Sequence, residues 1–369
     1  MKRQHTLTRK AESARARCIN AQGFTLAEVL VSMGILAILM AVTLSMVNMT
    51  TKLVRNTSGK ISAFKESRAA FDSLTRRVSQ STLNTYYDYV DSSGKSRKEV
   101  EDSGGVFVPD KYVRQSELHF VTGQANTLIP AAAGKIRPSH AIFFQAMLGF
   151  SSLPCSGDAQ LSNLLNAVGY FVEYGSDADF RPGFLDGITP ARNRYRLMQM
   201  VQNTETLRIY SQALTAGNRF EWFTKPLEAT PSQARPVAEN IVAAVFWARR
   251  AKEDSDGKAP LTANYTYDTK SYLSGGNAVS RNQLPPVVEV LLVAIDEPSA
   301  MRLEAKYAGT APLLQPGALF ATAPDPGGGG SSPLSDDLKK LTDFLTAESL
   351  NFRVFTTSIQ IRQSKFSAD

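Results

Sequence analysis

The pattern of apolar positions divides the chain into a helical N-terminal part and a β-rich remainder. Residues 29–47 are 19 consecutive positions with no charge and no proline, about the length a helix needs to cross the hydrocarbon core of a bilayer. A single carboxylate, Glu28, stands just before this run. We therefore predict a transmembrane helix over residues 24–47.

Helical periodicity continues beyond the apolar run. Five apolar residues recur at spacings of three, seven, three and four, which places them on one face of a helix: Ile61, Phe64, Phe71, Leu74 and Val78. This pattern predicts an amphipathic second half that extends to about residue 83 and packs on a sheet. Residues 55–59 are poor helix formers, so a bend or a melted turn is expected there.

The remainder, residues 84–369, alternates short β-prone runs with polar turns. Strands are predicted at 117–122, 141–146, 169–174, 195–201, 206–210, 241–249, 287–295 and 351–362. Ser335 is expected to cap a short helix that presents four apolar residues on one face: Leu338, Leu341, Phe344 and Leu345. The predicted fold class is α+β, with a long N-terminal helix packed on a mainly antiparallel β-sheet domain.

Two segments lie between the predicted long helix and the first predicted strand, and neither is predicted as a strand. Residues 91–105 are polar and rich in Gly and Ser, which predicts a loop. The aromatic segment Tyr86-Tyr87-Asp88-Tyr89 is interpreted as a packed aromatic corner, and a binding platform is the alternative.

Charge is concentrated in the first 23 residues. They hold six basic residues against one acidic residue, a net charge of +5 out of +7 for the whole chain, so that +2 is left if they are removed. A nearly neutral remainder gives no reason to expect a nucleic-acid partner. The basic cluster is typical of a cytoplasmic signal in front of a membrane segment. The candidate cleavage site, Gly23, precedes the apolar run, whereas an ordinary signal peptide is cleaved after it.

The segment Gly-Phe-Thr-Leu-Ala-Glu-Val-Leu-Val at residues 23–31 resembles the class III signal of type IV pilins and of the pseudopilins of type II secretion. The resemblance implies cleavage after Gly23 by prepilin peptidase, which removes the leader 1–23. It also implies N-methylation of the new terminal residue, Phe24, and a role for Glu28 in subunit assembly. The implied partners are other pilins or pseudopilins, bound through the N-terminal helix. The implied location is the inner membrane, with the N-terminus cytoplasmic and residues 84–369 periplasmic.

Elementary energetics adds an independent reason to single out Glu28. A carboxylate inside an apolar span costs several kcal/mol unless it is paired. The nearest cation would be a new α-amino group at Phe24, of the same chain or of an adjacent one. Pairing with a neighbour would favour one axial offset between helices. The alternative is a carboxylate that simply lies at the level of the lipid headgroups.

Two narrower resemblances concern the rest of the chain. Gly-Tyr-Phe-Val-Glu-Tyr at 169–174 and Leu-Pro-Pro-Val-Val-Glu-Val-Leu-Leu at 284–292 resemble segments of the large, J-type minor pseudopilins at the tip of the type II secretion pseudopilus. Three segments resemble the Verru_Chthon cassette protein C family, which is prepilin-like: Phe-Asp-Ser-Leu-Thr-Arg-Arg-Val-Ser-Gln at 71–80, Leu-Asn-Thr-Tyr at 83–86 and Phe-Arg-Val-Phe-Thr-Thr at 352–357.

Catalytic and metal-binding patterns are weak. The sequence has no Gly-x-Ser-x-Gly, Walker A, His-Glu-x-x-His or Rossmann pattern, so we predict that the protein is no enzyme and needs no cofactor. Asp254 and Asp256 form an Asp-x-Asp-Gly core with oxygen ligands for Ca²⁺, although an ordinary solvated turn is the simpler interpretation. Cys155 would be alone in the exported part, because Cys18 lies in the leader.

The sequence therefore favours a pilin-like subunit, in a minor position, of a type IV pilus or type II secretion-like filament. The rival hypothesis is a signal-anchored periplasmic binding or adhesion protein that uses the same helix only as an anchor and never assembles.

Overall fold

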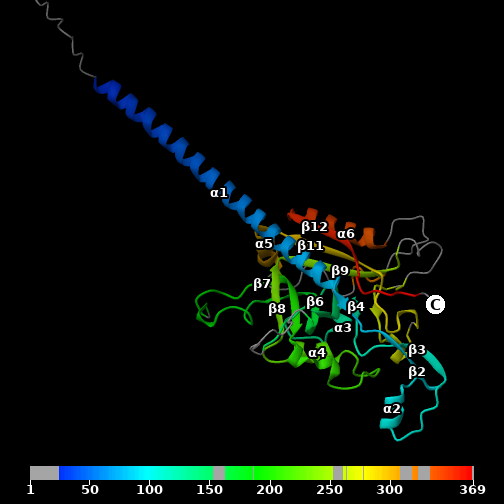
Figure 1. Ribbon diagram of the computed structural model, residues 1–369. Coiled ribbons are helices and arrows are strands. Elements are labelled where there is room, and N and C mark those ends of the chain that lie inside the picture. The colour runs from blue at the N-terminus through cyan, green and yellow to red at the C-terminus, as the bar shows by residue number, and fades with distance from the viewer. Residues whose placement is uncertain are drawn as a thin grey trace, which may run out of the picture. The chain divides into compact units, whose positions relative to one another are not determined.

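The computed structural model describes residues 25–152, 163–185, 187–251, 261–262, 264–276, 278–307, 318–322 and 333–367. The chain divides into two compact units, Met1–Arg55 and Asn56–Asp369. The first unit contains the apolar half of a long helix. The second contains the other half of that helix and all of the strands found among the described residues (Figure 1).

The long helix, α1, runs from Leu26 to Val78. The melted turn that was the alternative to a bend at residues 55–59 is absent, because the helix continues through them. A glycine costs a helix only about 1 kcal/mol, and propagation from the established turns on both sides offsets that cost. After Val78, the N–H groups of Ser79 and Gln80 still donate to Thr75 and Arg77. The chain then enters strand β1, Ser81–Thr82, before the predicted boundary near residue 83.

The larger sheet has seven strands within the described residues, and every pairing in it is antiparallel. Its strands follow the order β10 (Tyr267–Asp268), β4 (Val121–Gln124), β5 (His140–Met147), β6 (Leu165–Ser176), β7 (Asn193–Gln202) and β8 (Ala234–Glu239). The short β1 pairs with the end of β5, so the chain passes directly from α1 into this sheet.

A second, three-stranded sheet has the order β12 (Phe352–Gln360), β11 (Val287–Ile295) and β9 (Ile241–Arg249), again antiparallel. Two side chains at the start of β5 connect the sheets. The N–H groups of Ala244 and Phe246 on β9 donate to Ser139 Oγ at 3.1 Å and to His140 Nδ1 at 3.2 Å. The edge of β9 that does not face β11 is thus satisfied by side chains of the larger sheet.

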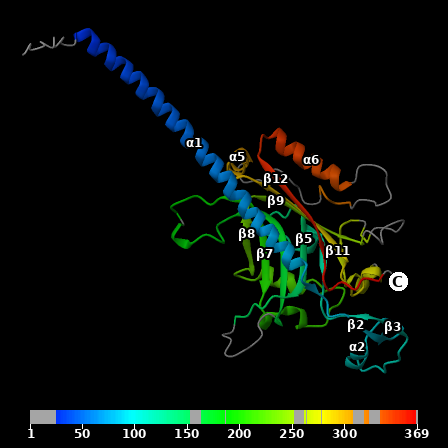
Figure 2. The ribbon, with the colours of Figure 1, turned by 45° about the horizontal axis from the view of Figure 1, so that its top comes forward.

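The apolar stripe of α1 becomes part of the core. Phe71, Leu74 and Val78 are buried, and the Phe71 ring lies 5.8 Å from the ring of Phe355 on β12. The predicted packing of the amphipathic half on a sheet is therefore confirmed. Helix α6 (Pro333–Ala347) also lies beside β12 in both views, and its residues Leu341 and Leu345 are buried (Figures 1 and 2).

The remaining helices among the described residues are short. They are α2 (Arg97–Asp102), α3 (Ala125–Leu128), α4 (Glu221–Glu228), α5 (Glu297–Tyr307) and the 3₁₀ helices η2 (Gly183–Leu185), η3 (Thr204–Thr206), η4 (Arg208–Tyr210), η6 (Ser271–Ser274) and η7 (Ala278–Ser280). Strands β2 (Tyr86–Val90) and β3 (Lys111–Gln115) form a separate antiparallel pair. This pair and α2 lie together at one end of the domain in both views (Figures 1 and 2).

Most of the predicted strands are confirmed, and the exceptions have local causes. The strand predicted at 206–210 is wrong, because the segment forms η3 and η4. The side chain of Gln202 accepts the Arg208 N–H at 3.1 Å, which favours a turn over an extended ladder. The loop predicted at 91–105 contains α2, whose Ser96 and Glu99 form a capping box. The C-terminal helix begins at Pro333 rather than after Ser335, and proline is well tolerated in a first helical turn.

Candidate functional site at the apolar helix

The apolar half of α1 has no covering within its own unit. Residues 26–55 form a segment of 30 residues, all of them exposed, in which an 18-residue stretch reaches a mean hydropathy of 2.4. Leu30, Ile38 and Met49 are 61%, 66% and 76% exposed, which no water-soluble surface would favour over so long a stretch. This is the one helix of the described residues that is long and apolar enough to cross a membrane.

The N-terminal end of this helix is closed by Glu28 itself. The Thr25 N–H and the Thr25 hydroxyl each donate to Glu28 Oε2 at 2.9 Å. In return, the Glu28 N–H donates to Thr25 Oγ1 at 3.3 Å. This reciprocal arrangement is a capping box, which satisfies two of the N–H groups that the first turn leaves without helical partners.

The capping box gives the lone carboxylate two local functions. Its negative charge lies at the positive end of the helix dipole, and its oxygens replace some of the hydrogen bonds that water would supply. Our sequence reasoning named Glu28 but missed Thr25. The Thr-x-x-Glu spacing at the start of an apolar run was the signal that would have identified it.

Several predicted site residues lie outside the described residues. These are the cleavage and methylation positions Gly23 and Phe24, the calcium candidates Asp254 and Asp256, and Cys155. The predicted pairing of Glu28 with a new amine at Phe24 therefore stays a prediction. Within the described ranges, no group of three or more His, Cys, Asp or Glu side chains is arranged to hold a metal ion.

The domain contains one constellation that resembles catalytic machinery. His119 Nε2 lies 2.7 Å from Asp268 Oδ1, and the Arg219 Nε donates to Asp268 Oδ2 at 3.0 Å. His119 has no exposed surface. Its second ring nitrogen, Nδ1, accepts from the Trp222 indole at 3.0 Å, where a triad would place a nucleophile. The His119–Asp268 pair therefore joins the segment before β4 to α4 and to β10 as a buried structural network.

The charge of Asp268 is maintained by its neighbours. Burial opposes the ionised form, but His119, the backbone N–H of Lys270 and Arg219 outweigh it, so the pKa of the Asp268 carboxyl lies below its ordinary value. The Lys270 N–H donates to Asp268 Oδ1 at 2.7 Å. Such a network is stabilising only while every member is present.

The tyrosines of β2 are not a packed aromatic corner, and that interpretation is wrong. Tyr86, Tyr87 and Tyr89 are 44%, 54% and 51% exposed on the two-stranded sheet. The Tyr112 ring on β3 lies 5.6 Å from that of Tyr87 and 5.0 Å from that of Tyr89. A two-stranded sheet has no second layer to cover both faces, so the rings cover one another instead.

The architecture is that of an α+β protein with a long N-terminal apolar helix followed by an antiparallel β-sheet domain, a layout like that of pilins. In a comparison with protein families, residues 19–44 match the prokaryotic N-terminal methylation motif. This match spans the predicted cleavage site and Glu28, and it supports a type IV pilin-like protein. Neither the curated proteins nor the solved structures contain a match to the chain.

The motif carries general consequences for the chain. It implies processing by prepilin peptidase and assembly with other pilins, and it suggests a structural, non-enzymatic protein. Together with the apolar half of α1, it fits a membrane-anchored protein that crosses the membrane once.

Proposed function

We propose that the protein is a minor, pilin-like subunit of a type IV pilus or of a type II secretion-like filament. Cleavage after Gly23 exposes Phe24, which is methylated, and the apolar half of α1 is retained for assembly. One observation carries the proposal: a methylation motif at 19–44 continues into a fully exposed apolar helix that contains a single carboxylate. In this proposal the domain lies in the periplasm.

Glu28 is the residue through which assembly would be selective. An unpaired acid costs about 3 kcal/mol at the centre of a membrane helix, and less near the end of the span, where Glu28 lies. The capping box offsets part of this cost within one chain, but the carboxylate is still an anion, and both bonds from Thr25 go to Oε2. The terminal amine of a neighbouring subunit supplies such a donor, and the pairing would select one axial offset between packed helices.

A minor position follows from size. For the 286 residues that follow Leu83, compactness scaling gives a width of roughly 50 Å, whereas the stem helix is about 10 Å across. A filament made only of such subunits would be crowded at its surface. Counting subunits in isolated filaments tests this point, since the protein as the major component would contradict it.

The finer assignments are part of the same proposal. Resemblance in the segments 169–174 and 284–292 supports a J-type minor pseudopilin at a filament tip, and resemblance in 71–80, 83–86 and 352–357 supports the Verru_Chthon cassette protein C family. Identification of the filament proteins that co-purify with this subunit would distinguish a secretion system from a pilus.

Four substitutions separate pairing from capping. Glu28→Gln retains the capping geometry but removes the charge, whereas Glu28→Ala removes both. Thr25→Ala weakens the cap and leaves the charge. Ser32→Ala is the matched control, because Ser32 lies one turn further along and its hydroxyl donates only to Val29 O, at 2.9 Å.

The measurement is the amount of the protein in sheared filaments relative to the membrane fraction, in cells that carry each variant. For both Glu28 variants we expect this filament-to-membrane ratio to fall by more than about tenfold, because loss of a buried ion pair costs several kcal/mol. For Thr25→Ala the ratio should fall by less than about fivefold, because removing one helix cap costs only about 1 kcal/mol. Normal assembly of Glu28→Gln would contradict the pairing, and normal assembly of Glu28→Ala would favour the anchored binding or adhesion protein.

A further inference from the structure

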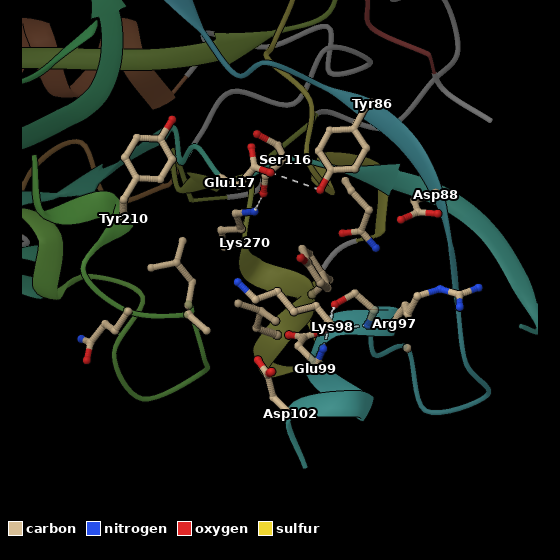
Figure 3. A pocket seen from close by; sticks show the side chains of 18 of the residues that line it. Tyr86, Asp88, Arg97, Lys98, Glu99, Asp102, Ser116, Glu117, Tyr210 and Lys270 are labelled. Carbon is tan, nitrogen blue, oxygen red and sulfur yellow. Dashed lines mark hydrogen bonds between the residues drawn. The ribbon is translucent and has the colours of Figure 1, made fainter. Parts of the chain in front are cut away.

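A polar cavity lies at the end of the domain that carries the β2–β3 pair. It has a volume of about 730 Å³, within the range of ordinary ligand sites. Four separate segments enclose it: the β2–β3 pair, α2 with the turn before it, residues 209–214, and residues 270–273 (Figure 3). None of these residues belongs to α1, so the cavity is independent of the assembly helix.

The cavity wall carries an excess of negative charge. Five acidic residues line it: Asp88, Glu99, Glu101, Asp102 and Glu117. Three basic residues line it: Arg97, Lys98 and Lys270. Five acidic against three basic side chains leave the lining with two more negative than positive charges, which favours a cationic guest.

Two of the three basic residues are already engaged by the protein. Lys270 is only 3% exposed, and its ammonium donates to Ser116 O and to Asn282 Oδ1. The Arg97 guanidinium lies 5.0 Å from the Phe107 ring centre and 3.8 Å from Glu101. The negative charges of Glu117 and Glu99 still act on the Lys270 ammonium, but the lining keeps five carboxylates against three cations.

Aromatic rings accompany the carboxylates. Tyr86, Tyr210 and Tyr272 line the cavity, and the Tyr86 hydroxyl donates to Glu117 Oε1 at 3.3 Å. Burial, followed by the negative charge of Glu117, raises the pKa of both Tyr86 and Tyr210. One carboxylate therefore acts on two rings from different segments. Carboxylates beside aromatic faces are the surroundings that ammonium and guanidinium groups prefer.

Lys98 shows how a cation fits this space. Its side chain extends from α2 into the cavity, and Asp102 lies on the same helix below it (Figure 3). The position that a guest cation would take is thus partly filled by a flexible side chain of the protein. A side chain of this kind is mobile enough to leave, because it is anchored only by its own helix.

We propose that this cavity binds a lysine or arginine side chain of a partner polypeptide. Glu117 and Asp102 supply the counter-charges, Tyr86 and Tyr210 supply aromatic walls, and Lys98 is an internal competitor for the same place. The site accommodates one basic side chain. The exposed rings of β2 and β3 would then lie beside the partner segment to which that side chain belongs.

The probe is fluorescein-labelled tetralysine, with tetraglutamate as the opposite charge, titrated into the full chain in a non-ionic detergent at low salt. Fluorescence anisotropy should show tetralysine binding at least about tenfold more tightly than tetraglutamate. The double variant Asp102→Asn with Glu117→Gln should bind tetralysine about fivefold more weakly. Glu228→Gln, which removes one negative charge from α4 outside the cavity, should stay within about twofold.

The direction in which Lys98→Ala changes the tetralysine affinity is the most informative result. Removal of the competitor should tighten tetralysine binding about threefold, a gain that misfolding does not produce. Weaker binding by Lys98→Ala, equal affinity for the two peptides, or an equal loss in Glu228→Gln and the double variant would each overturn the proposal. The filament measurement on the Glu28 variants is unaffected by either result, so the two proposals fail separately.

Discussion

The two units of this chain solve opposite solvation problems. In the first unit, residues 26–55 expose apolar side chains almost without exception, and their single carboxylate is satisfied by its own helix turn. In the second unit Phe71, Leu74 and Val78 of α1 are buried. Buried polar groups such as His119, Asp268 and Lys270 are paired with one another or with backbone atoms.

The difference indicates which surroundings each unit is built for. An exposed apolar helix is stable where lipid or other apolar helices replace water. A domain with charged residues in its interior needs a complete network, because each missing partner leaves a desolvated group. Changes within the domain should therefore alter its folding and leave membrane association intact, and the following substitutions test that separation.

The largest expected effect comes from the buried network. Asp268→Ala leaves His119 and Arg219 without their shared carboxylate, so the free energy of unfolding of the domain should fall by about 3–5 kcal/mol. Denaturant titration in detergent measures this loss, and the membrane-bound fraction of the protein should not change. Glu348→Gln, which removes the charge of a half-buried carboxylate paired with the exposed Lys306, is the control and should lower the free energy of unfolding by less than about 1 kcal/mol.

The second expected effect is a pH dependence of the domain's free energy of unfolding that is caused by His140. Burial is the main cause that lowers the pKa of His140, to about 4, so the folded domain keeps this ring neutral. The unfolded chain binds a proton near pH 6.5, so the stability from this residue is present above that pH and is lost as the pH falls toward 4.

Between pH 7 and pH 4.5, the wild type should lose roughly 2–3 kcal/mol more unfolding free energy than His140→Gln. Other acid-sensitive groups are common to both proteins and cancel in the difference. Equal losses in the two proteins would show that His140 is not held neutral between the sheets.

The smallest of these effects concerns a glycine that the core requires. A Cβ at Gly169 would lie 2.2 Å from Phe143, whose ring stacks on Phe223 at 3.9 Å. Gly169→Ala should therefore destabilise the domain by about 1–3 kcal/mol. Gly34 in the apolar half of α1 has nothing within 4 Å, so Gly34→Ala should leave domain unfolding as it is. Similar melting temperatures for the two variants would contradict this contrast.

The sequence was most informative where burial is continuous. The runs at 241–249 and 287–295 match β9 and β11 at both ends, because fully buried strands are uniformly apolar and bounded by turn residues. The apolar and amphipathic halves of α1 could also be predicted, the first from its unbroken apolar run and the second from its helical period. The sheet order could not, since it depends on pairings such as β10 with β4 that no local pattern encodes.

The failures occurred where side chains decide the local structure. The β-prone residues 206–210 turn because Gln202 binds the Arg208 N–H, and exposed tyrosines pair on β2 and β3 without a core. The polar cavity was missed altogether, because its walls come from four segments between residues 86 and 273. At the apolar helix, by contrast, the motif and Glu28 were readable, and only the cap by Thr25 was overlooked.

The central claim is that the apolar helix is a processed assembly helix, and its N-terminus tests this most directly. Mass analysis of the protein isolated from its own cells should find a chain that begins at Phe24 and carries one methyl group on its amine. A chain that begins at Met1, or that begins elsewhere than Phe24 without a methyl group, would contradict the account.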